Sequence, residues 1–455
     1  MDPTKVDTIT RWARGSRISG DPAATVTVVC TDSRALKAGD LFVALRGENF
    51  DGHAFVAEAA RLGATGVIVE EVAPGLPPDF TVIQVKDTLR ALQQIAAEYR
   101  RSLPMQVVAI TGSNGKTSTK DLTAAVLAER YPVTKTEGNF NNHIGLPLTM
   151  LRARSVDHVG VFEIGMNHPG EIAPLAALAA PDVAIITNIG IAHIEFMGSR
   201  EAIAQEKGML AEALPPSGTV ILSAEDEFSR GIAARTKADA VFCGIDEGDI
   251  RATDLRQDFA GIKFRLSAED RSVEVSLPVP GVHMVRNALL AAAAGRAFGL
   301  SLEECAAGLS KLRLTKGRLE QKLAHGVQII DDTYNANPDS MAAALETLAQ
   351  MPGTGRRIAV LGRMGELGTE SERGHQRVGE IAADLGLDCL ITVGDEAALI
   401  AEAAWRGGLS QVVKVATTEE AVKSLRALTR AGDVVLVKGS RSARMERVVE
   451  GMQAA

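Results

Sequence analysis

Apolar residues in the first hundred positions alternate between short runs of strand length and helical spacing. The strand-like runs are residues 25–30 (TVTVVC), 40–45 (DLFVAL), 65–71 (TGVIVEE) and 80–85 (FTVIQV). Helical periodicity appears at residues 53–63 and again at 88–103. The pattern predicts a small α/β domain that ends at Pro104, where a charged helix end meets a new apolar strand.

The middle of the chain carries longer and almost continuous apolar runs. They are residues 107–111 (VVAIT), 158–165 (HVGVFEIG), 182–190 (DVAIITNIG) and 219–225 (TVILSAE), each followed by a helix candidate. Continuous apolar runs are typical of a parallel sheet with helices on both faces. An extended piece with two prolines then enters an Ala-rich helix at residues 277–299, where we expect this part to close.

From about Gln321 strand and helix patterns alternate again, which indicates a Rossmann-like unit. The strand-like runs there include IAVLG, CLITVG and DVVLVKG. We therefore predict an α/β protein of three domains: a small N-terminal α/β domain at 1–104, a central P-loop-type parallel sheet with helices on both faces at 105–317, and a Rossmann-like domain at 318–455.

Composition narrows the classes of function. The 455 residues are 46% hydrophobic and 23% charged, which is typical of a globular protein. The net charge of −8 argues against nucleic acid or an anionic membrane as a partner bound by general electrostatics. No run reaches the length of a membrane span, the first residues lack the apolar core of a signal peptide, and the four cysteines lie far apart without metal-ligand spacing. We expect a cytoplasmic protein.

The segment VVAITGSNGKTSTK, residues 107–120, is the most informative stretch of the chain. An apolar strand runs into a glycine-containing loop and then a helix, so that backbone N–H groups and the helix N-terminus can bind phosphate. Ile110 stands where the usual nucleotide loop has glycine, and a plain Gly-Asn turn is the alternative. We predict ATP as the ligand. Its binding residues would be Gly112, Ser113, Asn114, Gly115, Lys116, Thr117 and Ser118.

Polar residues follow several strands, where sites form in parallel sheets. Glu163 ends one run and suits Mg²⁺, although a solvent-facing carboxylate fits as well. His193 follows another run, and a hydrogen-bonding role is at least as compatible with imidazole as magnesium ligation. Lys207 lies in a helical pattern and is by default a surface lysine. Residues 331–340 (DDTYNANPDS) suit a ribose, a phosphate or a second substrate, or a capped turn with Asp339 or Ser340 starting the helix.

Six ordered motifs resemble the Mur ligases of bacterial cell-wall synthesis. They are TGSNGKTS, GNFNNHIGLPLT, EIGMNHPGEIA, NIGIAHIEFMGS, HMVRNALLAAA and DDTYNANPDSM. The first segment, TDSRALKAGDLFVALRGENFDGHAF, is similar to that family's uridine-nucleotide-binding domain. The second and third motifs favour the branch that adds D-alanyl-D-alanine.

The resemblance implies an ATP-dependent amide ligase of peptidoglycan precursor synthesis, and with it a part in cell shape and cell division. Its substrates would be UDP-N-acetylmuramoyl-tripeptide and D-alanyl-D-alanine, and its intermediate an acyl phosphate. The third-position diamino acid of the tripeptide stays open. We expect a monomer whose outer domains swing onto the central one.

The resemblance also implies roles for single residues. Lys116 would hold the β- and γ-phosphates, Thr117 and Glu163 would bind one Mg²⁺, and His193 would place a second. Lys207 corresponds to a lysine that carries a carbamate. Lys116, Glu163, His193 and Lys207 form the predicted catalytic set.

Further residues are assigned to the other ligands. Asn287 corresponds to a position near adenine and Asp332 to one that meets the ribose. His143, Arg363 and Met209 depart from the family pattern. The residues assigned to the uridine nucleotide are Ser33, Arg34, Asp51, Gly52 and His53, and those assigned to the dipeptide are Asn139, Asn142 and Leu146.

Three alternatives stay open. The first is another amino-acid-adding enzyme, either a second Mur ligase or a folylpolyglutamate synthetase. The second is a switch ATPase, which would hydrolyse nucleotide under the control of a protein partner. The third is an inactive homologue, against which the joint presence of the four predicted catalytic residues argues.

Overall fold

The computed structural model describes residues 1–47 and 50–454. Glu48 and Asn49, in the predicted uridine-nucleotide segment, and Ala455 lie outside the described residues. The chain forms two compact units. Unit 1 contains residues 1–109, 131–166 and 170–182, and unit 2 contains residues 110–130, 167–169 and 183 onward. No helix among the described residues is both long enough and apolar enough to cross a membrane.

The N-terminal part of unit 1 is built on a five-stranded sheet in the order β2-β7-β6-β5-β4. Only β2 is antiparallel to its neighbour. The strands are β2 (Ser16–Ser19), β4 (Val29–Cys30), β5 (Leu41–Val43), β6 (Gly66–Val69) and β7 (Thr81–Gln84). The run predicted at residues 25–30 is divided, because β3 (Thr25–Val26) pairs separately with β1 (Thr4–Lys5).

Helices of this part follow the predicted periodicity with one difference. They are α1 (Val6–Trp12), α2 (Val56–Arg61) and α3 (Thr88–Ser102). The helix predicted from residue 53 begins as a 3₁₀ turn, η1 (Gly52–Phe55), because the Asp51 side chain accepts the His53 N–H and tightens the chain there. In α3 the buried residues Leu92, Ile95 and Tyr99 recur at helical spacing and form its inward face.

The remainder of unit 1 is a parallel strand group with two helices. Strands β8 (Gln106–Thr111), β10 (Val159–Glu163) and β9 (Val133–Lys135) follow one another in that order, and β10 pairs in parallel with β9. Strand β8 ends inside unit 2, which begins at Ile110. The helices are α5 (Gly145–Met150) and α6 (Ile172–Ala179).

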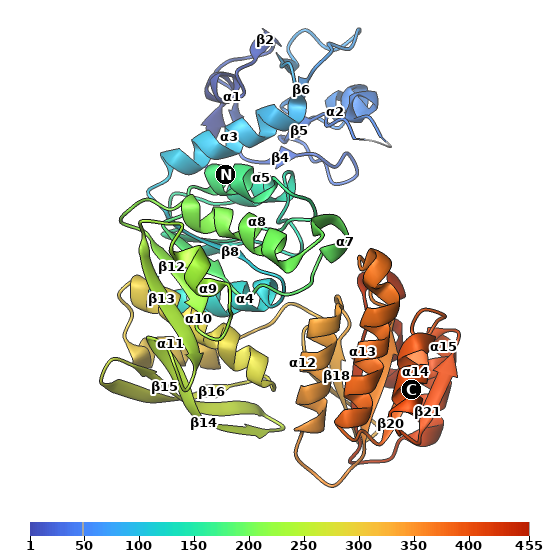
Figure 1. The fold of residues 1–455 in the computed structure, drawn as a ribbon. Helices are drawn as coiled ribbons and strands as arrows, with labels where there is room; N and C mark the ends of the chain where they lie inside the picture. The colour runs from blue at the N-terminus through green and yellow to red at the C-terminus, as the bar shows by residue number, and fades with distance from the viewer. Residues whose placement is uncertain (48–49, 455) are drawn as a thin grey trace. The chain divides into compact units, whose positions relative to one another are not determined.

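In unit 2 a six-strand run has the order β16-β15-β14-β13-β12-β11. The bounds are β11 (Val183–Ile186), β12 (Thr219–Ser223), β13 (Asp239–Ile245), β14 (Ile250–Asp258), β15 (Gly261–Ala268) and β16 (Arg271–Leu277). Strands β11 and β12 are parallel, as predicted, and β13 and β14, which the prediction lacked, continue the parallel pairing. Strands β14, β15 and β16 then form an antiparallel meander that the prediction also lacked (Figure 1). In β15 the buried side chains Ile262, Phe264 and Leu266 alternate with exposed ones, which is the period of a half-buried antiparallel strand.

The helices of this part of unit 2 begin with the one that follows the glycine loop. They are α4 (Lys116–Leu127), α7 (Ile194–Met197), α8 (Arg200–Glu212), α9 (Ser229–Ala233), α10 (Val282–Ala297) and α11 (Leu302–Ser310). Helix α10 contacts both α4 and β12. Its buried small side chains, such as Ala288 and Ala292, permit this close packing.

The C-terminal part of unit 2 is a doubly wound sheet in the order β17-β18-β22-β19-β20-β21, drawn in orange and red in Figure 1. Only β17 is antiparallel. The bounds are β17 (Glu320–Ala324), β18 (Val327–Asp332), β19 (Arg357–Gly362), β20 (Cys389–Val393), β21 (Val412–Val415) and β22 (Val434–Lys438). The helices are α12 (Pro338–Ala349), α13 (Ser371–Asp384), α14 (Ala398–Arg406), α15 (Thr418–Leu428) and α16 (Glu446–Gln453), with the short turns η2 (Gly368–Glu370) and η3 (Arg441–Ala443). The Rossmann-like prediction is confirmed.

Candidate nucleotide site

The glycine loop between β8 and α4 needs its glycines for two steric reasons. Gly115 has φ +78° and is the N-cap of α4, a left-handed conformation that side chains strain. A Cβ at Gly115 would lie 2.6 Å from Asn287 Oδ1, and a Cβ at Gly112 would overlap Thr187 Oγ1. The loop is therefore a tightly packed backbone segment, as a phosphate-binding loop requires.

The loop is fixed by the chain that follows β11. The N–H groups of Ser113 and Asn114 donate to the Asn188 backbone oxygen at 2.9 Å and to Asn188 Oδ1 at 3.0 Å. Thr187 Oγ1 donates to the Asn114 backbone oxygen at 2.5 Å. Sequence reasoning did not assign Thr187 and Asn188 to the site. Their signal is the polar pair Thr-Asn directly after the apolar run DVAII.

Lys116 and Thr117 open α4. Lys116 Nζ donates to the Gly112 backbone oxygen at 2.7 Å and lies 3.4 Å from the Ser113 oxygen. The side chain therefore curls over the loop that it was predicted to serve. Thr117, 6% exposed, lies in the first turn of the helix, where the partial positive charge of the helix dipole favours anions.

Lys207 of α8 is buried, with 1% of its surface exposed, so its interpretation as a surface lysine is wrong. Burial lowers the pKa of its ammonium well below the ordinary value, the nearby charge of Lys116 lowers it further, and Glu206 opposes both. A buried amine of this kind is neutral far more readily than a surface lysine.

His193 lies at the N-cap of α7 with φ +63°. Its Nδ1 is 2.8 Å from Oε2 of Glu366, in the loop after β19. The close approach of His193 is the main cause that lowers the pKa of the Glu366 carboxyl. Whether this histidine acts as a hydrogen-bonding group or helps to place a magnesium ion stays a prediction.

Two side chains at the start of α12 reach the same loops. Asn337 Nδ2 donates to Asn114 Oδ1 at 2.8 Å, and Asp339 Oδ2 accepts the Ile191 N–H at 3.1 Å. Asn337 is also the N-cap of α12, with Pro338 at its first position and Ser340 completing a capping box. The prediction that Asp339 or Ser340 starts the helix is thus wrong.

Asp332, at the end of β18, is 8% exposed and pairs with Lys438 at 2.5 Å. Lys438 Nζ also donates to the Asn335 backbone oxygen at 3.0 Å. Burial lowers the pKa of Lys438, against the opposing effect of Asp332. Burial likewise lowers the pKa of His283 to about 4, and His283 lies one helical turn before Asn287 on α10. The residues assigned to adenine and ribose therefore lie among buried, interacting groups of unit 2.

Arg318 is a site residue that sequence reasoning missed. Its guanidinium lies 4.3 Å over the ring of Tyr334, a cation–π contact, and Nη2 is 3.5 Å from Thr117 Oγ1. Its Nε is buried and has no hydrogen-bond partner among the described residues. Its signal is the Gly-Arg pair in KGRLE, at the predicted domain boundary.

Glu163, in unit 1, ends β10 and is 3% exposed, so the solvent-facing interpretation is wrong. Its N–H donates to Thr136 Oγ1 at 2.9 Å, and its Oε1 accepts Asn141 Nδ2 at 2.9 Å. Oε2 is buried without a partner among the described residues. An unpartnered buried carboxylate oxygen suits a hard cation such as Mg²⁺. No group of three or more His, Cys, Asp or Glu side chains in the described chain could hold a metal alone.

The residues assigned to the dipeptide have structural tasks of their own. Asn142 Oδ1 accepts the N–H groups of Ile144 at 3.2 Å and Gly145 at 2.9 Å, which starts α5. Leu146 is fully buried. His143 is exposed, and its backbone oxygen accepts a hydrogen bond from Gln93 Nε2 at 3.0 Å.

The residues assigned to the uridine nucleotide divide into two groups. Arg34 is 88% exposed and makes a bidentate contact with Asp32 at 2.9 and 2.8 Å. By contrast, Asp51 accepts the His53 N–H and Nδ1 at 2.9 and 2.6 Å, and Arg46 at 3.0 Å. These contacts, the His53 backbone N–H first, lower the pKa of Asp51 to about 2. Asp51 and His53 therefore already have hydrogen-bond partners within the protein.

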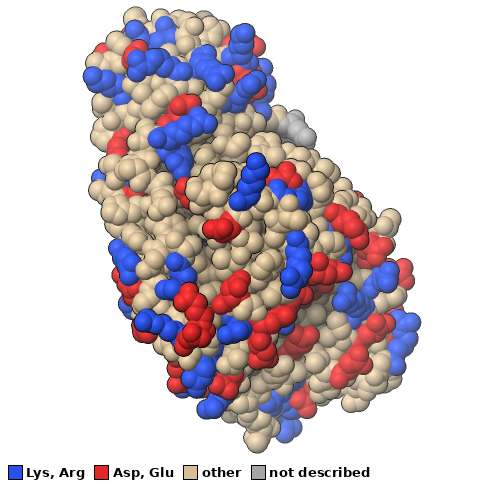
Figure 2. All heavy atoms as spheres, turned by 60° about the vertical axis from the view of Figure 1, so that its left-hand side comes forward, with Lys and Arg blue, Asp and Glu red and all other residues tan. Residues whose placement is uncertain are grey.

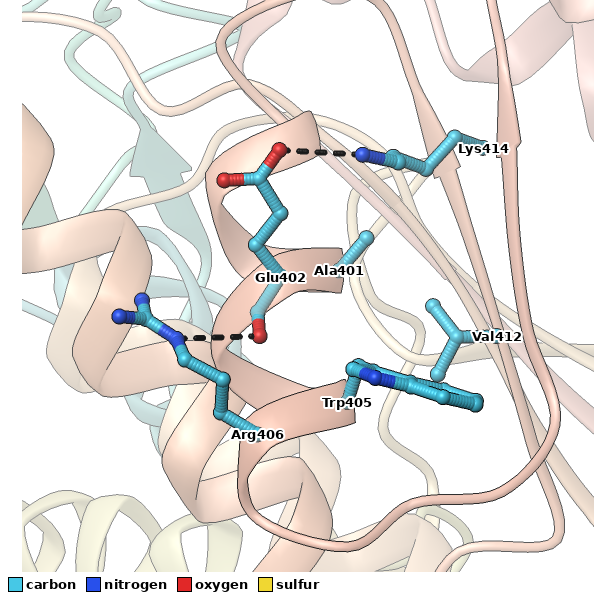
Figure 3. Close-up of a pocket in the computed structure, with 6 residues that line it drawn as sticks. All are labelled: Ala401, Glu402, Trp405, Arg406, Val412 and Lys414. Atoms are coloured by element: carbon cyan, nitrogen blue, oxygen red, sulfur yellow. Dashed lines mark hydrogen bonds and ion pairs between the residues drawn. The ribbon is translucent and has the colours of Figure 1, made fainter.

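A hollow of about 520 Å³ lies elsewhere, between α14 and β21 (Figure 3). Its cation Lys414 is paired with Glu402 at 3.0 Å, and Arg406 Nε lies 3.4 Å from the Glu402 backbone oxygen. The indole of Trp405 supplies an apolar wall. None of the predicted site residues lines it.

Acidic and basic side chains are interspersed over most of the face drawn in Figure 2. The departing residue Arg363 pairs with Glu396 at 3.0 Å in the C-terminal part, and both side chains are partly exposed.

Three family models match most of the chain. The model described as the Mur ligase middle domain matches residues 110–295, the Mur ligase glutamate ligase domain matches 317–441, and the Mur ligase family catalytic domain matches 25–100.

Individual relatives agree over nearly the full length. The UDP-N-acetylmuramoyl-tripeptide–D-alanyl-D-alanine ligase of Bacillus subtilis is 39% identical over 427 residues, covering 93% of this chain and 92% of the relative. The crystal structure of MurF from Acinetobacter baumannii superposes with a TM-score of 0.92 at 34% identity, covering 100% of this chain and 99% of that one. The MurF ligase of Thermotoga maritima, solved in complex with ADP, gives 0.85 at 31%, covering 94% and 97%. Matching family models along most of its length and close relatives over more than nine-tenths of it, the chain belongs to the Mur ligase family.

Proposed function

We propose that this protein joins D-alanyl-D-alanine to UDP-N-acetylmuramoyl-tripeptide and in doing so cleaves ATP to ADP and phosphate. The observation that carries the proposal is the packed glycine loop with Lys116 at the start of α4. The Bacillus subtilis relative, which bears the name of this activity, and the ADP complex of the Thermotoga maritima relative support it. The product would be the pentapeptide precursor of peptidoglycan, and the proposal includes a cytoplasmic location and a part in cell-wall growth and division.

The chemistry required is activation of a carboxylate. A carboxylate is a poor electrophile, so its oxygen first attacks the γ-phosphorus of ATP, forming an acyl phosphate and releasing ADP. The dipeptide amine then attacks the acyl carbon, and phosphate leaves. Lys116 and the N-terminus of α4 neutralise the charge on the transferring phosphoryl group, so catalysis rests on positioning and electrostatics.

Mg²⁺ fits the residues present. Glu163, with its unpartnered Oε2, and the Thr117 hydroxyl would hold one ion, and His193 would help to place a second. When bound, Mg²⁺ supplies positive charge that offsets the phosphate oxygens. Because no protein-built cage exists among the described residues, phosphates and water would complete the coordination.

Lys207 is proposed to carry a carbamate. Addition of CO₂ needs a neutral amine, and burial of Lys207 favours that form. The neutral amine nitrogen attacks CO₂ and loses a proton. The product is an anionic carbamate that can face Mg²⁺, whereas a protonated lysine would repel the ion. Incubation with ¹³C-bicarbonate should give a carbamate carbon signal that Lys207→Ala lacks, and short carboxylates should restore activity to that variant. Full activity of Lys207→Ala without them would overturn this role.

The remaining assignments complete the proposal. Asn287 would lie near adenine and Asp332 near the ribose. The domains 1–104, 105–317 and 318–455 would bind the uridine nucleotide, ATP with the reacting groups, and the adenosine side, in a monomer. The uridine nucleotide is assigned to Ser33, Arg34, Asp51, Gly52 and His53, and the dipeptide to Asn139, Asn142 and Leu146.

A phosphate-release assay with a panel of acceptors tests the function. UDP-muramoyl peptides are combined with single amino acids, D-alanyl-D-alanine or folate substrates. We expect phosphate release only when tripeptide and D-alanyl-D-alanine are both present. Label from ¹⁸O in the tripeptide carboxyl should also appear in the released phosphate. Release with ATP alone would favour a switch ATPase, and unlabelled phosphate would rule out the acyl phosphate.

A further inference from the structure

A buried carboxylate outside the predicted site lies on the same face of α4 as Thr117. Asp121 is 3% exposed and comes four residues, one helical turn, after Thr117. Its Oδ2 accepts two hydrogen bonds from Thr315, from the backbone N–H at 2.9 Å and from Oγ1 at 2.8 Å. Its other oxygen lies 3.3 Å from the ammonium of Lys120, itself 1% exposed. The Lys120 ammonium thus offsets the charge of the Asp121 carboxylate, and the two hydrogen bonds from Thr315 join α4 to a segment that is distant in the sequence.

The anchored segment leads directly to Arg318. Along α4 the four-residue step from Asp121 back to Thr117 rises about 6 Å. Three residues span at most about 10 Å even when extended, and residues 316–317 form a turn, so a chain fixed at Thr315 keeps Arg318 within reach of the first turn of the helix. There its Nη2 lies 3.5 Å from Thr117 Oγ1.

A second attachment fixes the same arginine from the other side. The Tyr334 N–H donates to the Gly317 backbone oxygen at 3.1 Å, and the Tyr334 ring lies under the Arg318 guanidinium at 4.3 Å. The guanidinium thus has a stacking surface and a helix-side contact, while its buried Nε has no partner among the described residues. An arginine with donors to spare beside a phosphate loop is arranged to receive an anion.

We propose that Asp121, acting through Thr315, is a positioning residue that holds Arg318 beside the glycine loop for the phosphates of ATP. The role rests on the proposed ligase function. A fixed arginine contributes more to phosphoryl transfer than a mobile one, because little reorganisation remains when charge develops.

Thr315→Val is the sharpest variant, since it removes one hydrogen bond to Asp121 but leaves the backbone bond and the Lys120 pair in place. Thr123→Val is the matched control, because the Thr123 hydroxyl on α4 is buried and has no partner among the described residues. We expect Thr315→Val to lower kcat/KM for ATP about fivefold to tenfold and to weaken binding of a non-hydrolysable ATP analogue severalfold. Thr315→Ser should restore both, and Thr123→Val should change neither.

A double-mutant cycle separates positioning from general stability. In an Arg318→Lys background, which keeps the charge but loses the planar fork, Thr315→Val should have less than a twofold further effect on analogue affinity. Equal effects in both backgrounds, or an unchanged Thr315→Val enzyme, would overturn the proposal. Because analogue binding is read without ligation, wild-type protein that binds the analogue but forms no amide would refute the proposed function instead.

Discussion

The glycine loop of unit 2 and the uridine-nucleotide segment of unit 1 were both predicted to bind phosphate-bearing ligands, yet they differ in how their polar groups are occupied. In the loop, the side chains of Thr187 and Asn188 bond to the backbone of Asn114, and Asn337 Nδ2 donates to the Asn114 side chain. In the uridine segment the charged side chains themselves are joined, with Arg46, Asp51 and His53 bonded to one another.

The difference separates two ways of building a site. Supporting groups around the loop fix its backbone at the N-terminus of α4, where Lys116 Nζ donates to the Gly112 oxygen. In the uridine segment Asp51 accepts three donors, and His53 Nε2 accepts the Glu70 N–H at 2.9 Å, so these residues organise the chain. Among the residues assigned to the uridine nucleotide, the exposed Arg34 is therefore a better candidate for contact with the ligand than Asp51 or His53. The comparison yields four predictions.

The largest effect is expected at the loop. Lys116→Ala removes the charge that meets the transferring phosphoryl group. It should raise the activation free energy by on the order of 3 kcal/mol, which lowers turnover roughly a hundredfold or more. Phosphate release in the presence of both substrates measures it. Lys414→Ala, which breaks an exposed pair with Glu402, is the control and should be nearly silent. Near-normal turnover of Lys116→Ala would mean that the loop does not act on phosphate.

Much of the fold was predictable because apolar periodicity reports burial directly. The strands at residues 107–111, 158–165 and 182–190 and helix α8 lie where the pattern placed them. The antiparallel strands β14 to β16 were not predicted. Their apolar residues alternate with polar ones, whereas the prediction for the middle of the chain rested on continuous apolar runs. The family resemblance, rather than periodicity, carried most of the site.

What the sequence could not provide is the environment of each residue. Lys207 and Glu163 look like surface charges in their local sequence, yet both are buried. Arg318 and Asn337 reach residues about two hundred positions earlier in the chain. Such pairings depend on the packed tertiary structure, and no local pattern encodes them.

The second prediction concerns Glu163, whose buried Oε2 has no partner among the described residues and is proposed to bind Mg²⁺. Glu163→Gln retains the shape but loses the negative charge, so the Mg²⁺ concentration for half-maximal activity should rise at least about tenfold. A magnesium titration measures this, with Glu137→Gln as an exposed control in the same unit. An unchanged magnesium requirement would remove Glu163 from the proposed metal site.

The third prediction tests Arg34. Its pair with Asp32 is so exposed that breaking it should leave the thermal midpoint unchanged. If the guanidinium meets the uridine nucleotide, Arg34→Ala should raise KM for the UDP substrate roughly fivefold, the scale of one lost contact of about 1 kcal/mol. KM for ATP serves as the internal control. An unchanged KM for the UDP substrate would return this residue to a purely surface role.

The smallest effect is expected at Asp51, and it should appear in stability rather than in affinity for ATP. The pKa of Asp51 is about 2, below the ordinary value of 3.8, so its contribution to stability is complete above about pH 4 and is lost as the pH falls toward 2. Asp51→Asn cannot titrate, and its thermal midpoint should be a few degrees lower near neutral pH, with the gap to wild type closing in acid. Affinity for an ATP analogue should stay constant, because Asp51 supports the uridine segment alone. A gap that is constant from pH 6 to pH 2.5 would show that the carboxylate charge does not hold this segment, and the contrast with the glycine loop would then rest on shape rather than on charge.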